Sequence, residues 1–288
     1  MKKRINEKVI LILLSVLLLS NVLLTINAIR MNNELEQQKQ INIEILDMLE
    51  DEESSSDEVN NFNSDKEVGS KDIEQNKDNK KGLKVAIDAG HQQNQNSEQE
   101  PIGPGASETK MKVASGTEGC ETKIPEYQVT LEISKKLEKV LKDRGYEVYM
   151  VRNENEVNIS NKERADLAYK SGADVFVRVH CNSSESSSAN GALTICQTPS
   201  NSFVSMYNDS KKLSDDVLAE LCLETGAKNN GVMETDTMSG INWSKIPVTI
   251  VETGFMSNPE EDRKLSDPNY QEKIAVGISD GIDKYFAK

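Results

Sequence analysis

Short apolar runs rich in β-branched residues alternate with helical patterns along residues 83–288, and this alternation constrains the possible folds more than any other feature. Five runs have the length and composition of buried strands: residues 84–88, 147–151, 174–179, 192–196 and 247–251. Four segments carry apolar residues at helical spacing: residues 125–144, 161–170, 202–225 and 269–286. Strands that alternate with helices predict a single α/β domain with a twisted, mainly parallel sheet covered by helices on both faces.

The first 30 residues predict a transmembrane anchor. Basic residues at positions 2–4 precede an apolar run over residues 9–29, which is about long enough to cross a bilayer as a helix. Basic residues before such a run favour a cytoplasmic N-terminus, so we expect a single-pass cell-membrane protein whose remaining residues are extracytoplasmic. A cleavable signal peptide ending at Ala28, with secretion of the remainder, is the alternative, but the apolar run is longer than a usual signal core.

Residues 31–82 predict a linker. Acidic residues far outnumber basic ones there, Ser, Asn and Gln are frequent, and apolar residues are almost absent after Leu49. Such a segment buries too little apolar surface to offset the entropy lost on ordering, so we expect a disordered tether, with a juxtamembrane helix favoured over residues 32–53. The whole chain has a formal net charge of -14, which argues against nucleic acid as a partner because no basic excess neutralises phosphates.

Three of the predicted strands end in side chains that are suited to chemistry. His91 and His180, the chain's 2 histidines, each follow a strand, and so does Glu252. Open α/β sheets bind ligands beyond the carboxyl ends of their strands, so these side chains should lie at one edge. Glu126 joins them because it shares the apolar face of the predicted helix 125–144. A glutamate in a first turn often serves only as a partner for the helix dipole, which is the alternative for Glu126.

The four residues together favour a metal centre. Two imidazoles and one carboxylate with an open fourth position form a recurrent catalytic zinc set. A nearby carboxylate that is not a ligand can then serve as the general base. Either histidine alone could equally be a hydrogen-bonded loop residue, but the combination predicts one Zn²⁺ ion.

Several motifs carry a resemblance to a known family: IDAGH, IPEYQVTLEISKKLEKVLKDRGYEV, VNISNKERADLA, DVFVRVHCNS and VTIVETGFMSNPEED. Through them, residues 83–288 resemble the zinc-dependent N-acetylmuramoyl-L-alanine amidases of bacterial cell-wall hydrolysis, the amidase type 3 family. The resemblance implies that His91, Glu126 and His180 are the zinc ligands and that Glu252 is the catalytic glutamate. It also implies a peptidoglycan substrate, in which zinc-activated water cleaves the amide between N-acetylmuramic acid and the L-alanine of the stem peptide.

The sequence departs from the family pattern in two places. The family usually has a small residue at the position of Arg178, two residues before His180 and therefore on the same strand face. We expect Arg178 to pair with an acidic side chain, and binding of a substrate carboxylate is the alternative. The second departure is segment 92–124, which is longer than the Gly-rich turn common in the family. Because it borders the site, we expect it to affect substrate access.

The chain's 4 cysteines are Cys120, Cys181, Cys196 and Cys222. An even number outside the membrane permits disulfides, but no C-x-x-C spacing exists, so a structural zinc site is not expected. We expect free, mostly buried thiols, with one disulfide as the alternative.

Two other functions are compatible with parts of the pattern. A zinc hydrolase of another wall bond, such as a peptidase or a deacetylase, could use the same metal set, although the ETGFMSNPEED motif favours the amidase. A non-catalytic wall-binding domain is the second alternative, and the loss of a ligand would be its signature. All four residues are present in the chain, so the sequence favours an enzyme.

Overall fold

The computed structural model describes residues 82–287. The predicted membrane anchor, and all but the last residue of the predicted linker, lie outside the described residues. Within residues 82–287, no helix combines the length and the apolar character that a membrane span requires.

Six strands form the central sheet, in the order β4-β1-β5-β8-β6-β7. Their bounds are β1 (Lys84–Ala89), β4 (Glu147–Met150), β5 (Val175–Asn182), β6 (Ala192–Cys196), β7 (Asn229–Glu234) and β8 (Val248–Phe255). β4, β1, β5 and β8 run parallel to one another. β6 runs antiparallel to β8, and β7 is parallel to β6. The predicted mainly parallel α/β sheet is therefore confirmed, with two reversed strands at one edge.

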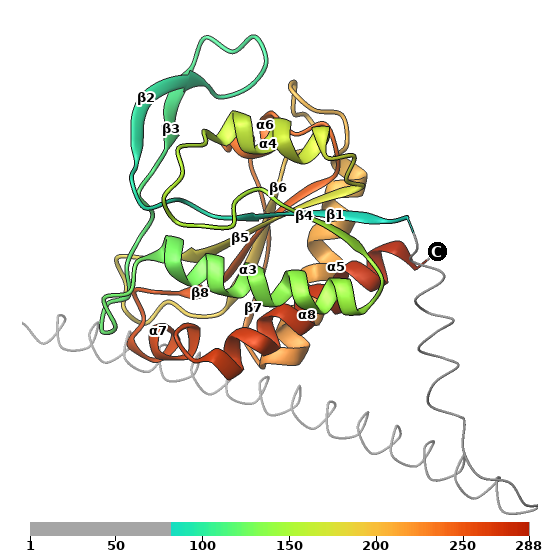
Figure 1. Cartoon of the computed structure of the whole chain (residues 1–288). Coiled ribbons are helices and arrows are strands. Elements are labelled where there is room, and N and C mark those ends of the chain that lie inside the picture. Colours follow the sequence, from blue (N-terminus) through green and yellow to red (C-terminus); the bar gives the residue numbers. More distant parts are fainter. Residues whose placement is uncertain (1–81, 288) are drawn as a thin grey trace, which may run out of the picture. The chain divides into compact units, whose positions relative to one another are not determined.

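Helices cover both faces of this sheet (Figure 1). One face carries α3 (Glu126–Asp143), α5 (Tyr207–Thr225) and α8 (Pro268–Phe286), and the other carries α4 (Asn161–Lys170) and α6 (Ser239–Asn242). A short helix, α7 (Pro259–Leu265), follows β8. Successive side chains of a strand point to opposite faces, so the strands between these layers read as continuous apolar runs.

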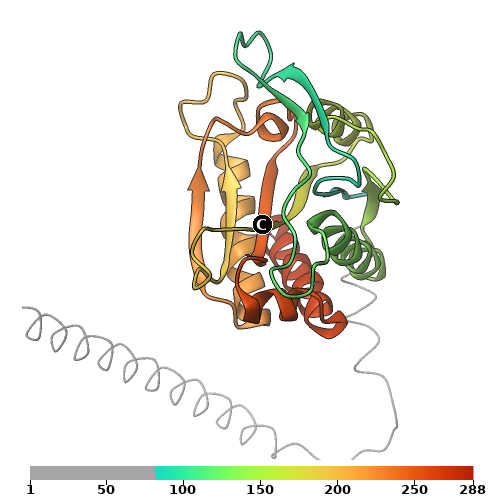
Figure 2. The same ribbon diagram turned by 90° about the vertical axis from the view of Figure 1, so that its left-hand side faces the viewer.

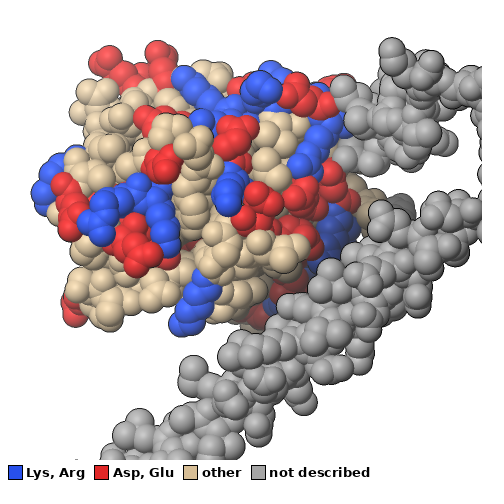
Figure 3. Space-filling model, turned by 90° about the horizontal axis from the view of Figure 1, so that it is seen from below, with Lys and Arg blue, Asp and Glu red and all other residues tan. Residues whose placement is uncertain are grey.

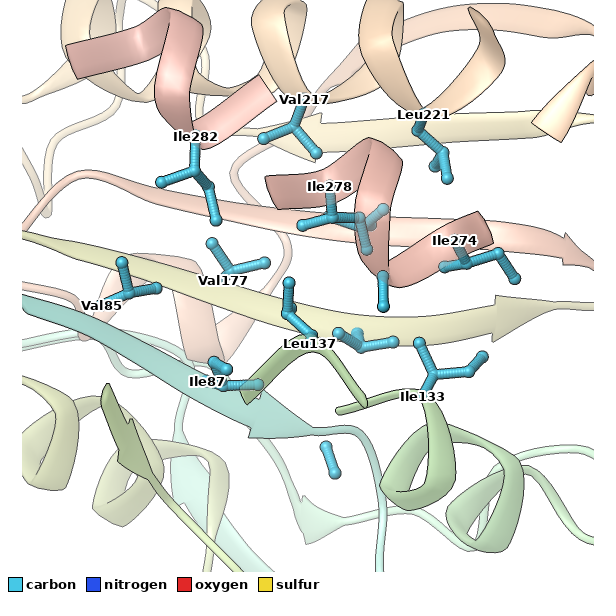
Figure 4. Packing of buried hydrophobic residues seen from close by; sticks show 14 of the residues in the cluster. Val85, Ile87, Ile133, Leu137, Val177, Val217, Leu221, Ile274, Ile278 and Ile282 are labelled. Atoms are coloured by element: carbon cyan, nitrogen blue, oxygen red, sulfur yellow. The ribbon is translucent and has the colours of Figure 1, made fainter. Parts of the chain in front are cut away.

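The larger core lies between the sheet and the layer of α3, α5 and α8 (Figure 4). Fully buried aliphatic residues from all of these elements meet there: Val85, Ile87, Ile133, Leu137, Val177, Val217, Leu221, Ile274, Ile278 and Ile282. The intervening strand residues Ala86, Phe176 and Ile250 face the second core under α4 and α6. This packing fixes the strand register, because a slip of one residue would exchange the two faces.

Local sequence determines where several helices begin. Ser160 and Glu163 form a capping box at the start of α4, each side chain bonding the other's backbone N–H. Asp267 caps α8 and is followed by Pro268, whose missing N–H costs nothing in a first turn. Asn258 caps α7 in the same way, by accepting hydrogen bonds from the backbone of Glu260 and Glu261.

A β-hairpin interrupts segment 92–124 and was not among the predicted strands. It consists of β2 (Asn96–Pro101) and β3 (Thr109–Val113), which pair antiparallel in a separate sheet. Figure 2 shows it projecting at the top of the domain. Two hydrogen bonds join the hairpin to the residues that flank α6. Trp243 Nε1 donates to the Pro101 carbonyl at 2.8 Å, and Lys110 Nζ donates to the Thr237 carbonyl at 2.7 Å.

Charged side chains of both signs intermingle on the face that Figure 3 shows. Helix α3 carries the surface pairs Lys139–Asp143 and Lys142–Glu138, each one turn apart, with Glu138 half-buried. Pairs of this kind contribute little to stability in water. Their mixture of signs leaves no single-sign field on this face.

Candidate active site

The residues expected to bind a metal converge at one edge of the sheet. His91 follows β1, Glu126 is the first residue of α3, and His180 lies within β5. One potential ligand atom from each lies within 4.8 Å of the others. His91 Nε2 is 3.2 Å from Glu126 Oε2, and His180 Nδ1 is 3.1 Å from Glu126 Oε1. The structure thus brings the three side chains together around one carboxylate.

Glu252 lies beside this cluster on the neighbouring strand. Its register partner in β5 is His180, so the two side chains leave the sheet on the same face. Both β5 and β8 continue beyond the predicted strands, to Asn182 and Phe255, and the two site residues are inside strands rather than after them. Glu252 Oε2 and His180 Nε2 are among the buried polar atoms that lack a hydrogen-bond partner in the described part of the chain.

Two glycines allow the chain to pass close to the site. A Cβ atom at Gly90 would lie 2.5 Å from the His180 ring, and one at Gly116 would lie 2.7 Å from Glu126 Oε2. Gly116 also has a φ of +79°, a conformation that costs glycine little. Side chains at these positions would therefore displace the cluster.

Backbone groups orient the three side chains. His91 Nδ1 lies 2.8 Å from the Ala114 carbonyl, which can only accept, so this nitrogen carries the proton and Nε2 keeps its lone pair. Glu126 accepts further hydrogen bonds from the backbone N–H groups of Cys181 and Thr117, both at 3.0 Å. Such outer contacts fix the tautomer and position of groups that bind metals.

Two buried arginines, which the sequence reasoning missed, hold the loop after β1. Arg152 donates to the carbonyls of Ala89 and Gly90 at 2.8 and 3.0 Å. Arg164 donates to the carbonyl of His91 at 2.9 Å, and His91 has a left-handed φ of 58°. Each arginine stands inside or directly after an apolar pattern, and this signal could have revealed both. A permanent charge that is buried in this way needs polar partners.

The electrostatics favour the protonation states that bind a metal. Burial opposes ionisation of Glu126, but the neighbouring His180 and His91 rings outweigh it and hold the pKa of this carboxyl well below its usual range. Burial lowers the pKa of His180, which favours the neutral ring. Burial, with the charge of Glu126 as a further cause, raises the pKa of Glu252 to about 8. Two neighbouring carboxyl groups thus differ strongly in acidity, a pattern common at catalytic sites.

A cavity of about 300 Å³ opens next to the cluster. His91, His180 and Glu252 line one end of it. The remaining wall comes from the sheet, the β2–β3 hairpin, α4 and the loop that leads into α6, and it includes Arg178, Ile250, Lys110, Met111, Asn161 and Gly240. The expectation that segment 92–124 borders the site is confirmed, since its residues Lys110, Met111, Val113 and Ala114 contribute to the lining.

Arg178 pairs with an acidic side chain, as expected. Its Nε donates to Asp88 Oδ2 at 2.9 Å, and its Nη2 donates to Asn161 Oδ1 at 2.8 Å. The 4 cysteines are free in the structure, also as expected: Cys181 and Cys196 are buried, and Cys120 and Cys222 are half-buried.

Comparisons with known proteins agree with this geometry. A family model described as N-acetylmuramoyl-L-alanine amidase matches residues 85–284. The N-acetylmuramoyl-L-alanine amidase LytC of Bacillus subtilis is 32% identical over 161 residues, which are 56% of this chain and 31% of LytC. The chain therefore spans about a third of the length of that relative.

Solved structures show the same fold. The catalytic domain of CwlV, an amidase of Bacillus (Paenibacillus) polymyxa var. colistinus, is 29% identical with a TM-score of 0.56, over 70% of this chain and 97% of that one. Ami1 of Mycobacterium smegmatis is 23% identical with a TM-score of 0.66, over 72% of this chain and 97% of that one. The match of the family model over most of the described domain shows that the chain belongs to the N-acetylmuramoyl-L-alanine amidase family.

Proposed function

We propose that residues 83–288 form a zinc-dependent catalytic domain that hydrolyses the amide between N-acetylmuramic acid and the L-alanine of the peptidoglycan stem peptide. The convergence of His91, Glu126 and His180 within 4.8 Å, beside the buried carboxyl of Glu252, is the observation that carries the proposal. Membership of the amidase family supports cleavage of this amide bond rather than the activity of a peptidase or a deacetylase.

The residues fit a zinc ion. Two imidazoles and one carboxylate are the donor set of many catalytic zinc sites, which keep one position open. The low pKa of Glu126 and the lowered pKa of His180 make the ionised carboxylate and the neutral ring available at neutral pH. Nε2 of His180 is buried and has no hydrogen-bond partner within the described residues. Buried ring nitrogens normally have a partner, so this atom supports the binding of a metal ion.

Glu252 carries the proton transfers in this proposal. A bound zinc ion supplies a Lewis acid that polarises the amide carbonyl and lowers the pKa of water. Glu252 Oε2 faces the site without a hydrogen-bond partner, so it can take the proton of the attacking water. It then returns this proton to the alanine nitrogen as the amide bond breaks.

We further propose a division of the chain into three parts. Residues 1–30 act as a single-pass membrane anchor, residues 31–82 act as an acidic linker, and residues 83–288 carry the catalysis outside the cell membrane. The basic start and the apolar run over 9–29 support the anchor. Such an arrangement would keep the enzyme close to its polymeric substrate.

Substitution of the two glutamates tests the proposal, because their roles differ. Glu126→Ala removes a ligand and should lower both zinc content and the stability that zinc binding adds. Glu252→Gln removes only the base, so the variant should keep zinc, while its turnover falls by about 100-fold or more. Zinc is measured by elemental analysis, and hydrolysis of purified peptidoglycan is followed by mass spectrometry of the released muropeptides.

Each alternative gives a different result in this experiment. If Glu252→Gln loses zinc and Glu126→Ala retains it, the two roles are exchanged. If both variants remain fully active, the catalytic proposal is wrong. Products cut within the stem peptide, or glycans that lose acetyl groups, would instead identify a peptidase or a deacetylase.

A further inference from the structure

Arg178 is held rigidly in the floor of the active-site cavity. It is 3% exposed, and its partner Asp88 is fully buried. Asp88 accepts from Nε and Asn161 accepts from Nη2, which fixes the plane of the guanidinium group. On the third side, Nη1 lies only 1.5 Å from the point that a Cβ atom at position 240 would occupy, so it fits against the chain only because residue 240 is glycine. An arginine fixed in this way loses little entropy on binding a ligand.

The cavity wall around Arg178 is positively charged. Lys110 also lines the cavity, and its Nζ donates to the carbonyl of Thr237, which lines the cavity as well. Glu252 is the sole carboxylate among the lining residues. Asp88 lies beneath Arg178, away from the cavity lining, so it balances the buried charge without occupying the ligand side. In a chain of net charge -14, this arrangement points to an anionic ligand group.

Hydrogen-bonding capacity remains on the Arg178 side chain. A guanidinium group has five N–H donors, and Asp88 and Asn161 account for the hydrogen bonds found on Nε and Nη2. Nη1 donates no hydrogen bond within the described residues. It is also not among the buried polar atoms without a partner, so it is not completely buried. A carboxylate can therefore approach Nη1 from the cavity without breaking the pair with Asp88.

The spacing between Arg178 and His180 matches about two residues of an extended stem peptide. Arg178 stands two residues before His180 on the same face of β5, a distance of about 7 Å along a strand. An extended peptide advances about 3.5 Å per residue. When the scissile amide lies beside His180 and Glu252, the backbone groups of the residue after L-alanine therefore reach the level of Arg178.

We propose that Arg178 determines substrate specificity by binding the free α-carboxylate of the second stem residue, a D-glutamate that is linked onward through its side-chain carboxyl group. This inference rests on the proposed amidase function and names the substrate form that the site prefers. A stem in which this carboxylate is amidated offers Arg178 no negative charge. A hydrogen bond between two charged groups is stronger than a neutral one, so the acid form should be favoured by about 10- to 100-fold.

The experiment compares two muramoyl tetrapeptides that differ only in this group, one with D-glutamate and one with D-isoglutamine at the second position. The zinc-loaded full chain should cleave the acid form with a kcat/KM about 10- to 100-fold higher. A calorimetric titration of Glu252→Gln with the same two compounds should show the same preference in Kd, which separates recognition from turnover.

Two matched variants assign the preference to its residue. Arg178→Gln should remove most of the preference. Lys112→Gln, on the same hairpin as Lys110 but paired with Glu98 outside the cavity, should retain it. If Arg178→Gln retains the preference, another group recognises the carboxylate and the proposal is wrong.

The wild-type chain alone can also overturn the proposal. Equal cleavage and equal binding of the acid and the amide would refute the role of Arg178 and leave the amidase function intact. Absence of cleavage of both compounds and of purified peptidoglycan would refute the proposed function itself, and the inference with it.

Discussion

Asp88, Arg164 and Arg178 form a fully or almost fully buried charge network directly under the active site. Arg164 Nη1 and Arg178 Nε lie 2.7 and 2.9 Å from the two oxygens of Asp88. Burial alone would raise the pKa of Asp88, but the two guanidinium groups outweigh it and lower the pKa from 3.8 to about 2. One carboxylate thus balances two buried cations, and its ionisation is essential to the local structure.

Asp88→Asn should destabilise the domain strongly at neutral pH, by about 3–5 kcal/mol, because two buried guanidinium groups lose their counter-charge. A carboxyl group whose pKa is lower in the folded state stabilises that state above its unfolded pKa, and this contribution disappears as the pH falls through the folded pKa. The difference between wild type and Asp88→Asn should therefore shrink between pH 4 and pH 2, the window set by the two pKa values.

Urea unfolding of metal-free protein at pH 6 and at pH 2.5 measures this difference. Glu98→Gln serves as the control, because Glu98 pairs with Lys112 at the surface and its loss should change stability by no measurable amount. A gap between wild type and Asp88→Asn that stays constant over the whole range would show that the ionisation of Asp88 does not stabilise the fold.

The residues of the site could be predicted from the sequence only where they follow a strand or helix pattern. His91, His180 and Glu252 stand at the ends of apolar runs, and Glu126 shares a helix face, so strand direction and helical phase were enough to bring them together. Arg152 acts through backbone carbonyls of a loop. The charge directly after an apolar run could have marked Arg152 as a residue of interest, but the sequence does not show which backbone carbonyls it contacts, because carbonyls are present at every position.

Helices α5 and α8 pack unusually closely. A Cβ atom at Gly277 would lie 2.8 Å from the Cα of Leu221, and one at Gly281 would lie 2.4 Å from the Cα of Val217. The two glycines are one turn apart on the same side of α8. The backbone of α5 therefore rests directly on the backbone of α8, which side chains at these positions would prevent.

Gly281→Ala should lower the free energy of unfolding by about 1–2 kcal/mol. Alanine favours a helix over glycine by about 1 kcal/mol, but overpacking of a buried contact costs about 1–3 kcal/mol, and here the contact is with backbone atoms that cannot rotate away. Urea unfolding measures the change, with the exposed Lys273→Ala on the same helix as the control. A more stable Gly281→Ala variant would show that the two helices separate at little cost.

The strands that the sequence analysis missed share one property: they lack an apolar pattern. The residues of β2, β3 and β7 are mostly exposed and polar, so no alternation of apolar residues marks them as strands. β7 pairs only with β6 at the edge of the sheet, and the hairpin is attached through Trp243 and Lys110. Tertiary contacts rather than local propensity determine these elements, and the hairpin among them shapes the cavity.

Chain topology brings the residues of the site together. The parallel strands β1, β5 and β8 are neighbours in the sheet although they are far apart in the sequence. Their carboxyl ends therefore deliver His91, His180 and Glu252 to one edge, and the crossover helix α3 returns Glu126 to the same place. The reversal of β6 and β7 does not affect this edge, because both strands lie beyond β8. The prediction of parallel strands was thus sufficient to bring these four side chains together, but it did not predict the cavity beside them.

We expect residues 83–288 to lie outside the cell membrane. Residues 9–29 are uninterrupted by charge and, as a helix, would span about 30 Å, the thickness of a bilayer core. The basic residues 2–4 favour retention of the N-terminus in the cytoplasm, which places residues 83–288 outside. Protease added to intact cells whose wall has been removed should therefore cut the acidic linker and release a folded domain, because a compact α/β core resists cleavage longer than a polar segment.

Mass spectrometry of the released fragment checks this outcome, and a cytoplasmic protein that stays intact controls for lysis. A domain protected until detergent is added would mean that the orientation is reversed. A domain already present in the medium before protease, with an N-terminus after Ala28, would identify a cleaved signal peptide. Only the anchored form gives release that depends on the protease, because an apolar helix of this length does not leave the bilayer spontaneously.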